Sequence, residues 1–181
     1  MAWLQTRALV GRFNKGDVYA LQEIYDLHKK DMMTLAASLM FDKSVAEDVL
    51  HEVFVKLIGL QGRLRIKNML RGYLLQAVAN EARTMNRARA RKESADKGKF
   101  SCRRADVDSP DGCAERTEQH QRLTAALGEL PYEQREVVLL RHYGQVKFKA
   151  IAKAQGVSMS TVQARYRYGL SKLRSLLGRD L

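Results

Sequence analysis

Histidine and cysteine side chains are the first candidates for chemistry, because they serve proteins as nucleophiles, acid–base groups and metal ligands. The four histidines are spread along the chain without a metal-binding spacing: His28, His51, His120 and His142. Cys102 and Cys113 precede His120, but their spacing fits no common zinc signature. We expect reduced, unpaired thiols, with a zinc site or redox switch at these three residues as the alternatives. With no glycine-rich phosphate loop or nucleophile–base set, we expect no enzymatic reaction, metal or cofactor.

Lysine and arginine side chains offer a second chemistry, the binding of phosphate groups. The formal net charge of the 181 residues is +12. Residues 61–104 hold 13 basic and 3 acidic residues, and residues 137–181 hold 9 basic and 1 acidic. Between them, residues 105–136 hold 3 basic and 8 acidic residues. Two separate basic blocks favour two footprints on one nucleic acid over a plain solvated basic surface.

The first basic block includes a regular row of arginines. Arg83, Arg87 and Arg91 follow one another at four-residue spacing, which places them on one line of a helix expected from about Asn68 to beyond Arg91. A row of guanidinium groups on an exposed helix suits phosphate contacts. An ordinary solvated basic face is the alternative.

The elements that must carry these residues are helices. The chain has only 2 prolines and is rich in good helix formers, so we expect an all-α fold. We predict two small helical domains, at 8–92 and 119–179, joined by a flexible linker at 93–118 that is polar and lacks apolar periodicity. No apolar run reaches the roughly 18 residues of a membrane helix, and no signal-like segment begins the chain. We therefore expect a cytoplasmic protein without stable membrane insertion.

The N-terminal domain contains a helix with an acidic outer face. Asp17 is expected to cap an earlier helix, and Ser44 with Glu47 has the spacing of a capping box that opens this one. Asp48 and Glu52 are four residues apart, so two like charges face each other, which is mildly unfavourable. The face is either an ordinary solvated one or a docking surface for a basic protein partner.

The C-terminal domain is expected to form four helices, the last two of which make a helix-turn-helix from about Lys147 to Arg174. Gly156 makes the turn and Ser158 caps the last helix, which is expected to run to about Leu177. Short side chains near its start allow close approach to base edges, and longer ones further along reach bases or phosphates: Ser160, Thr161, Ala164, Arg167 and Tyr168. This layout predicts a helix that enters the DNA major groove.

Taken in order, these motifs resemble those of bacterial RNA polymerase sigma factors of the extracytoplasmic-function group. The segment 46–54, AEDVLHEVF, resembles the core-polymerase-binding helix of that family. The segment 73–80, YLLQAVAN, resembles the start of its promoter-melting helix. Leu130-Pro131, Arg135-Glu136 and the segment 148–174 resemble its −35-binding domain.

The resemblance implies roles for matching positions and for partners. It implies that core RNA polymerase is bound at its β′ clamp helices by Asp48, His51 and Glu52. It implies that the −10 element is contacted by Arg63, Arg65, Lys67, Asn68, Asn80, Arg83 and Arg87. It implies that the −35 element is contacted by Ser160, Thr161, Gln163, Ala164, Arg165, Arg167, Tyr168 and Lys172. The resemblance also implies promoter DNA and an anti-sigma factor as partners.

The chain departs from the family at three positions. His51 stands where Gln is usual, Tyr73 replaces Trp, and Thr84 replaces an Asp often found four residues after the Asn. The main alternative is a stand-alone helix-turn-helix repressor or activator. That alternative explains residues 119–179 but neither the acidic face nor Asn80.

Overall fold

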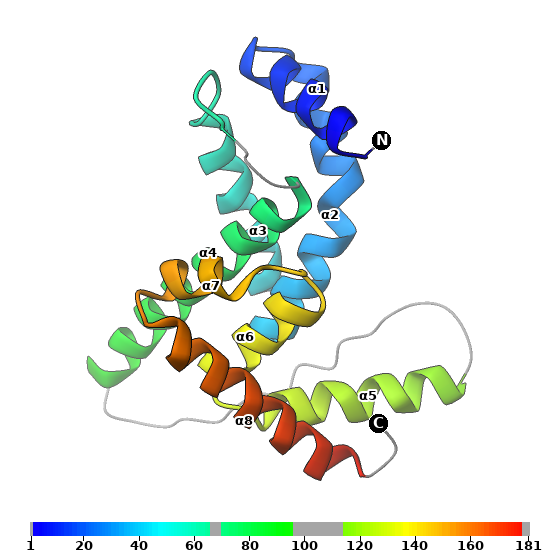
Figure 1. Cartoon of the computed structure of the whole chain (residues 1–181), viewed down its shortest axis with the longest axis vertical. Helices are drawn as coiled ribbons and strands as arrows, with labels where there is room; N and C mark the ends of the chain where they lie inside the picture. Colours follow the sequence, from blue (N-terminus) through cyan, green and yellow to red (C-terminus); the bar gives the residue numbers. More distant parts are fainter. Residues whose placement is uncertain (1, 66–69, 96–113, 179–181) are drawn as a thin grey trace.

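The computed structural model describes residues 2–65, 70–95 and 114–178. These residues form eight helices and no strand, which confirms the prediction of an all-α fold (Figure 1). The helices are α1 (Ala2–Asn14), α2 (Val18–Met40), α3 (Lys43–Ile58), α4 (Leu70–Ala95), α5 (Ala114–Gly128), α6 (Tyr132–His142), α7 (Phe148–Gln155) and α8 (Met159–Leu177). None of them is both long and apolar enough to cross a membrane within the described ranges.

The long helix α2 organises the first half of the chain. It packs against α1, α3 and α4, and we call these four helices the N-terminal unit. Helix α8 plays the same part in the C-terminal unit, where it packs against α5, α6 and α7. The two units touch, because α6 contacts α2 and α4, and α7 contacts α4. Figure 1 shows α1 at one end of the molecule and α5 with α8 at the other.

Helices α2 and α3 each begin just after a residue whose side chain accepts hydrogen bonds from the free backbone amides of the first turn. Asp17 caps α2 by accepting from the amides of Tyr19 and Ala20, as the sequence predicts. The predicted capping box of α3 is wrong. Asp42 caps that helix instead, accepting from the amides of Ser44 and Val45, because the helix already begins at Lys43 and places Ser44 inside its first turn.

Helix α1 is a feature that the sequence analysis did not anticipate. Its inner face buries Leu9, Val10 and Phe13. At its end, the Asn14 side-chain amide donates to the Leu64 carbonyl at 2.8 Å, and the Leu64 amide donates back to the Asn14 side-chain oxygen at 3.1 Å. This two-way pairing fixes the segment after α3, which carries Arg63 and Arg65, onto the end of α1.

The hydrophobic core runs from one unit into the other. The predicted inner face of α3 is confirmed, since Val49, Leu50, Val53 and Leu57 are all buried. The same cluster includes side chains of the C-terminal unit, among them Val137, Leu140 and Ile151 of α6 and α7. A second, smaller cluster joins α5, α6 and α8. The units therefore share apolar contacts as well as polar ones.

The helix-turn-helix has the predicted bounds. Gly156 ends α7 in the left-handed conformation at φ 67°, which a side chain would disfavour. Ser158 then caps α8 by accepting from the Thr161 amide. Further along α8, Gly169 lies against α6, and a Cβ atom there would approach Cγ2 of Val138 to 2.8 Å. This close approach lets α6 and α8 pack with their backbones near each other.

The packing at Gly169 gives a stability prediction. Gly169→Ala should lower the free energy of unfolding by about 1–3 kcal/mol, because the methyl group overfills the α6–α8 contact. The control is Gly11→Ala in α1, where no described atom lies within 4 Å of the new Cβ. Its better helix propensity should leave stability equal or raised by up to about 1 kcal/mol. Chemical denaturation of both variants checks this, and equal effects would contradict it.

The Asn14–Leu64 pairing gives a second prediction. Asn14→Ala should speed hydrogen exchange of the Leu64 amide on the order of tenfold. Each hydrogen bond of the pairing stabilises the closed segment by about 1 kcal/mol, so its loss lets the Leu64 amide open to solvent more often. Gln22→Ala is the control, since Gln22 bonds to Asp26 within α2. Exchange measured by NMR should change at Leu64 in the first variant alone. An unchanged Leu64 rate in Asn14→Ala would show that the pairing does not hold this segment.

Candidate nucleic-acid interface

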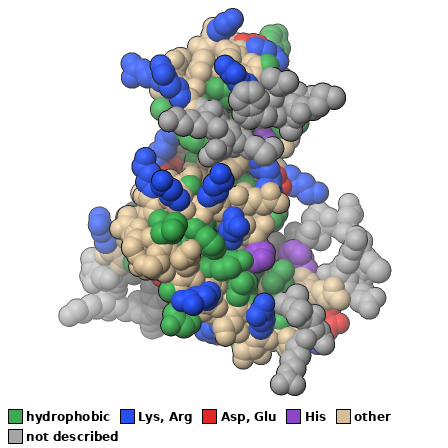
Figure 2. All heavy atoms as spheres, in the orientation of Figure 1, with side chains coloured by type: hydrophobic (Ala, Val, Ile, Leu, Met, Phe, Trp, Pro, Cys, Tyr) green, Lys and Arg blue, Asp and Glu red, His purple; other side chains and the backbone are tan. Residues whose placement is uncertain are grey.

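Basic side chains cover much of the surface. The face in Figure 2 carries many Lys and Arg side chains and few acidic ones. Among the residues predicted to contact the −10 element, Arg63 and Arg65 are exposed beside the segment that Asn14 holds. Lys67 and Asn68 lie outside the described residues. The exposed part of this group can therefore meet phosphates without rearrangement.

The outer face of α3 combines acidic and apolar side chains. Asp48 and His51 are exposed and Glu52 is half-buried, so the structure brings the three predicted docking residues onto one accessible helix face. The next turns of the same helix expose Val55 and Ile58, at 48% and 50%. Exposed apolar groups beside carboxylates suit a partner that offers both cations and apolar contact.

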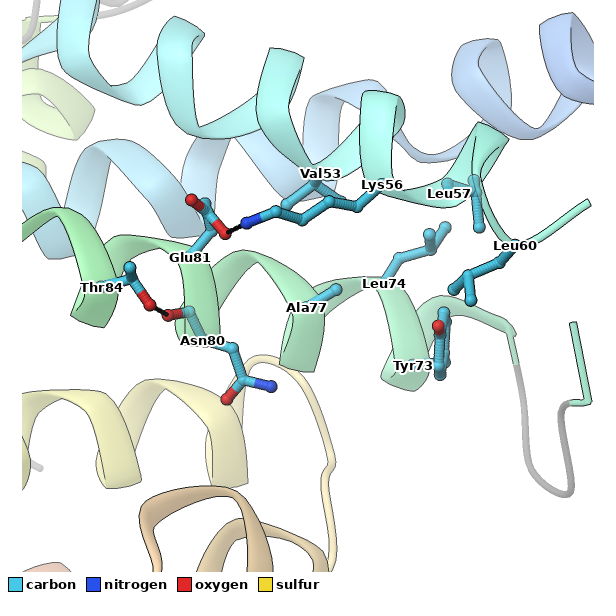
Figure 3. Close-up of a pocket in the computed structure, with 10 residues that line it drawn as sticks. All are labelled: Val53, Lys56, Leu57, Leu60, Tyr73, Leu74, Ala77, Asn80, Glu81 and Thr84. Atoms are coloured by element: carbon cyan, nitrogen blue, oxygen red, sulfur yellow. Dashed lines mark hydrogen bonds and ion pairs between the residues drawn. The ribbon is translucent and has the colours of Figure 1, made fainter.

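A cavity of about 330 Å³ lies between the end of α3 and the start of α4 (Figure 3). Tyr73 and Asn80, two helical turns apart on α4, both line it. Lys56 and Glu81 form an ion pair at its side, which ties α3 to α4. Thr84, which departs from the family pattern, donates its hydroxyl to the Asn80 backbone carbonyl at 3.0 Å. Tyr73 offers an aromatic ring near Leu60 at one end of the cavity, and the Asn80 amide points from α4 away from α3 (Figure 3).

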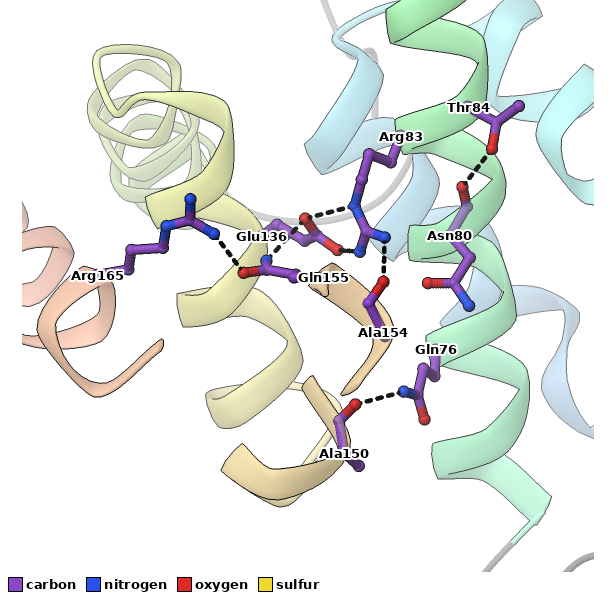
Figure 4. A network of polar contacts seen from close by, with 9 residues as sticks. All are labelled: Gln76, Asn80, Arg83, Thr84, Glu136, Ala150, Ala154, Gln155 and Arg165. Atoms are coloured by element: carbon purple, nitrogen blue, oxygen red, sulfur yellow. Dashed lines mark hydrogen bonds and ion pairs between the residues drawn. The ribbon is translucent and has the colours of Figure 1, made fainter. Parts of the chain in front are cut away.

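Arg83 does not face solvent in the predicted row of arginines. Its side chain is 13% exposed and forms an ion pair with Glu136 of α6, whose side chain is fully buried. It also donates to the Ala154 carbonyl at 2.7 Å, at the end of α7 (Figure 4). Arg87 and Arg91 remain exposed on α4. The prediction that Arg83 lies in an exposed row is therefore wrong, because Glu136 and the Ala154 carbonyl of the C-terminal unit bind its guanidinium.

Three further polar contacts join the units. Asp31 of α2 accepts from the Tyr143 hydroxyl at 2.7 Å and from Arg71 of α4, and Arg71 also donates to the Tyr143 carbonyl at 2.9 Å. The Arg71 hydrogen bond lowers the pKa of Asp31, which keeps that carboxylate charged. Burial raises the pKa of the Tyr143 phenol, so the hydroxyl stays a donor. Gln76 of α4 donates to the Ala150 carbonyl of α7 at 2.9 Å.

Arg135, next to Glu136, also reaches the N-terminal unit. It donates to the Leu39 carbonyl at 3.2 Å, and its guanidinium lies 4.4 Å from the centre of the Phe41 ring. Arg135 is itself buried. Sequence reasoning noted the pair Arg135-Glu136 only as a motif and assigned it no contact. Both side chains are buried, and buried charges need partners, but the sequence does not mark either residue as buried.

The helix-turn-helix presents most of the predicted −35 residues on one accessible face of α8. The exposed members are Ser160, Gln163, Arg167, Tyr168 and Lys172, and Thr161, Ala164 and Arg165 are half-buried. Tyr168 is 66% exposed and can reach a base or phosphate. Arg165 donates to the Gln155 side chain at 2.7 Å, and Gln155 in turn donates to Glu136 at 3.0 Å. Lys172 donates to the Glu129 carbonyl.

No metal-binding group emerges from the described part of the chain. There, no three His, Cys, Asp or Glu side chains come together in an arrangement that could hold a metal ion. Cys102 and Cys113 lie outside the described residues, so the alternatives of a zinc site or redox switch stay untested.

Two family models match the chain, one in each unit. Residues 24–92 match the model for Sigma-70 region 2, and residues 120–173 match that for Sigma-70, region 4. The first match covers the α3 face and the cavity beside Asn80. The second covers the helix-turn-helix. The division into domains at 8–92 and 119–179 stays a prediction, although the two matches fall one within each.

Curated relatives align with nearly the whole chain. RNA polymerase sigma factor CarQ of Myxococcus xanthus is 26% identical over 167 residues, covering 92% of this chain and 94% of that protein. An RNA polymerase sigma-E factor of Streptomyces avermitilis is 29% identical over 167 residues, with 92% and 90% covered. ECF RNA polymerase sigma factor SigX of Bacillus subtilis is 26% identical over 157 residues, with 84% and 81% covered.

Solved structures share the fold. The sigma factor RpoE of Bartonella quintana, in complex with the anti-sigma factor NepR, aligns with a TM-score of 0.70 at 23% identity, covering 91% of this chain and 100% of that one. CnrH, in complex with the cytosolic domain of CnrY, aligns with a TM-score of 0.67 at 21% identity, covering 97% and 99%. With region 2 and region 4 both matched in the expected order, the chain belongs to the extracytoplasmic-function group of the sigma-70 family of RNA polymerase sigma factors.

Proposed function

We propose that this sigma factor docks on core RNA polymerase with α3, holds unstacked −10 bases beside α4 and reads the −35 element with α8. One observation carries the proposal: the acidic α3 face and the Asn80 cavity lie on one unit, and the helix-turn-helix lies on the other. A stand-alone helix-turn-helix regulator needs only the second unit. The chain itself performs no reaction in this scheme, since binding free energy alone positions the polymerase.

The docking step rests on the outer face of α3. Asp48 and Glu52 repel each other in the free chain, and a basic helix on the polymerase would relieve that repulsion. Val55 and Ile58 extend the face with apolar area that desolvates the charged contacts at its edge. We propose the β′ clamp helices as the partner, with Asp48, His51 and Glu52 as the polar contacts.

The −10 step rests on the cavity between α3 and α4. A base that leaves the duplex loses stacking, at a cost of a few kcal/mol. Tyr73 offers it an aromatic surface, and the Asn80 amide can both donate to and accept from a base edge. Arg63 and Arg65 are exposed on the segment that the Asn14–Leu64 pairing holds, a few residues after Leu60 of the cavity lining, and would hold the strand by its phosphates. The Lys67 and Asn68 contacts belong to the same proposal.

The −35 step rests on the first turns of α8. Ser160 and Gln163 are exposed near its N-terminal end, and Arg167 and Tyr168 follow one turn later. This order suits insertion of the N-terminal end into the major groove, with Arg165 and Lys172 nearer the phosphates.

We further propose that the chain acts in the cytoplasm and is restrained by an anti-sigma factor. The support for the restraint is the Bartonella quintana relative, which is in complex with an anti-sigma factor.

The docking proposal predicts the effect of a charge reversal. Glu52→Arg should weaken binding to core polymerase by at least about tenfold, because it sets a cation against the basic partner. Glu118→Arg is the matched control, since it makes the same charge change on α5, where Glu118 pairs only with its exposed neighbour Arg122 among the described residues. Affinity measured by fluorescence anisotropy should fall for the first variant alone. Equal affinities for both variants would remove α3 from the interface.

Substitutions in the α4 surface and in the α8 surface should each weaken binding to a different promoter element. In the assembled holoenzyme, Asn80→Ala should weaken binding to a fork template with unpaired −10 bases by about tenfold, through lost hydrogen bonds to a base. Tyr168→Ala should instead weaken binding to a −35 duplex by about tenfold. Each variant is the control for the other. If both variants lose both probes equally, the assignment of one element to each unit is wrong.

A further inference from the structure

The ion pair between α4 and α6 engages Arg83, one of the predicted DNA contacts, through its guanidinium group. Arg83 Nε donates to Glu136 Oε2 at 3.3 Å, Nη2 donates to Oε1, and Nη1 donates to the Ala154 carbonyl at 2.7 Å. Gln155 completes the site by donating to Glu136 at 3.0 Å (Figure 4). Every nitrogen of the guanidinium therefore already has an acceptor inside the chain.

A guanidinium binds carboxylates and phosphates with the same planar, two-pronged geometry. Glu136 therefore satisfies Arg83 in the way that a DNA phosphate would. Because Glu136 of α6 occupies the Nε and Nη2 donors and the Ala154 carbonyl of α7 occupies Nη1, a DNA phosphate can take the two-pronged position on Arg83 only after Glu136 leaves it. The pair and DNA are mutually exclusive partners of this arginine.

The distance between promoter elements leads to the same conclusion independently. The −10 and −35 elements are about 25 base pairs apart, which is about 85 Å of duplex at 3.4 Å per base pair. In the structure, α4 and the helix-turn-helix are in direct contact, with Gln76 bonded to the Ala150 carbonyl at 2.9 Å. The units must separate before α4 and α8 can each reach its own element.

We propose that this closed arrangement of the two units is self-inhibiting, with Glu136 holding Arg83 in place of a promoter phosphate. The inference rests on the proposed −10 role of α4 and adds a residue, Glu136, that controls access to it. Opening exchanges one charged acceptor for another, so Arg83 is not left without a counter-charge when DNA is present. Free chain stays closed, and single-stranded −10 DNA shifts it to the open state.

The test compares two charge-matched variants of the full chain. Glu136→Gln weakens the pair, whereas Glu133→Gln removes the same charge from an exposed position on the same helix. Glu136→Gln should bind a single-stranded −10 oligonucleotide about tenfold more tightly than Glu133→Gln, because a larger fraction of the chain is open. Equal affinities overturn the proposal.

A double variant shows whether the gain acts through Arg83. In an Arg83→Gln background, Glu136→Gln should bring no further gain in affinity for the oligonucleotide. The same tenfold gain in both backgrounds overturns the proposal, because Glu136 would then act by another route. A −35 duplex serves as the folding control, since α8 needs an intact C-terminal unit to bind it. If wild type and all variants bind neither probe, the proposed function itself fails, which is a separate result.

A second measurement keeps wild-type Glu136 and so does not depend on how that variant folds. Dyes on Lys15→Cys and Arg174→Cys, in a chain with Cys102→Ser and Cys113→Ser, mark the exposed ends of the two units. The −10 oligonucleotide should lower energy transfer between the dyes, and an oligonucleotide of scrambled sequence should lower it less. Unchanged transfer at saturating −10 DNA overturns the proposal.

Discussion

The buried ion pair between Arg83 and Glu136 decides how the two halves of the chain sit. Glu136 is fully buried and Arg83 nearly so, and breaking such a pair by removing one partner typically costs about 3–5 kcal/mol. The contacts of Gln76, Arg71 and Arg135 with the opposite unit surround this pair and depend on the same approach of α4 and α2 to α6 and α7. With an apolar cluster that continues across both units, the polar contacts fix a specific register rather than a loose association.

This constraint reconciles two demands on the same surface. A sigma factor must expose cations to DNA, yet a chain of net charge +12 with all its cations free would bind any nucleic acid. The structure pairs Arg71 and Arg83 internally and leaves Arg63, Arg65 and Arg87 exposed. Non-specific attraction is therefore reduced without removing the residues that the promoter would use. The α3 face is separate from these contacts, since Asp48 and His51 remain exposed in the closed chain.

Local features of the fold were predictable because they depend on neighbouring residues. The helix-turn-helix follows from Gly156, Ser158 and the apolar stripe of α8, and the buried face of α3 follows from its spacing. Contacts between units were not predictable, because nothing in the row from Arg83 to Arg91 distinguishes the arginine that meets Glu136 from those that meet solvent. The cap of α3 was misassigned since Asp42 and Ser44 are both good caps, and only the true helix start selects between them. Helix α1 was missed because its contact with Leu64 joins residues that are 50 positions apart in the sequence.

The measurement that tests the account most directly is run-off transcription by purified core polymerase with this chain on fragmented genomic DNA. We predict new start sites that share one sequence near −10 and another near −35, with the spacing between the two held nearly constant. The constant spacing is expected because both surfaces belong to one chain docked at one place on the polymerase. Start sites identical to those of core polymerase alone would contradict the account, as would sites that share only the −35 sequence.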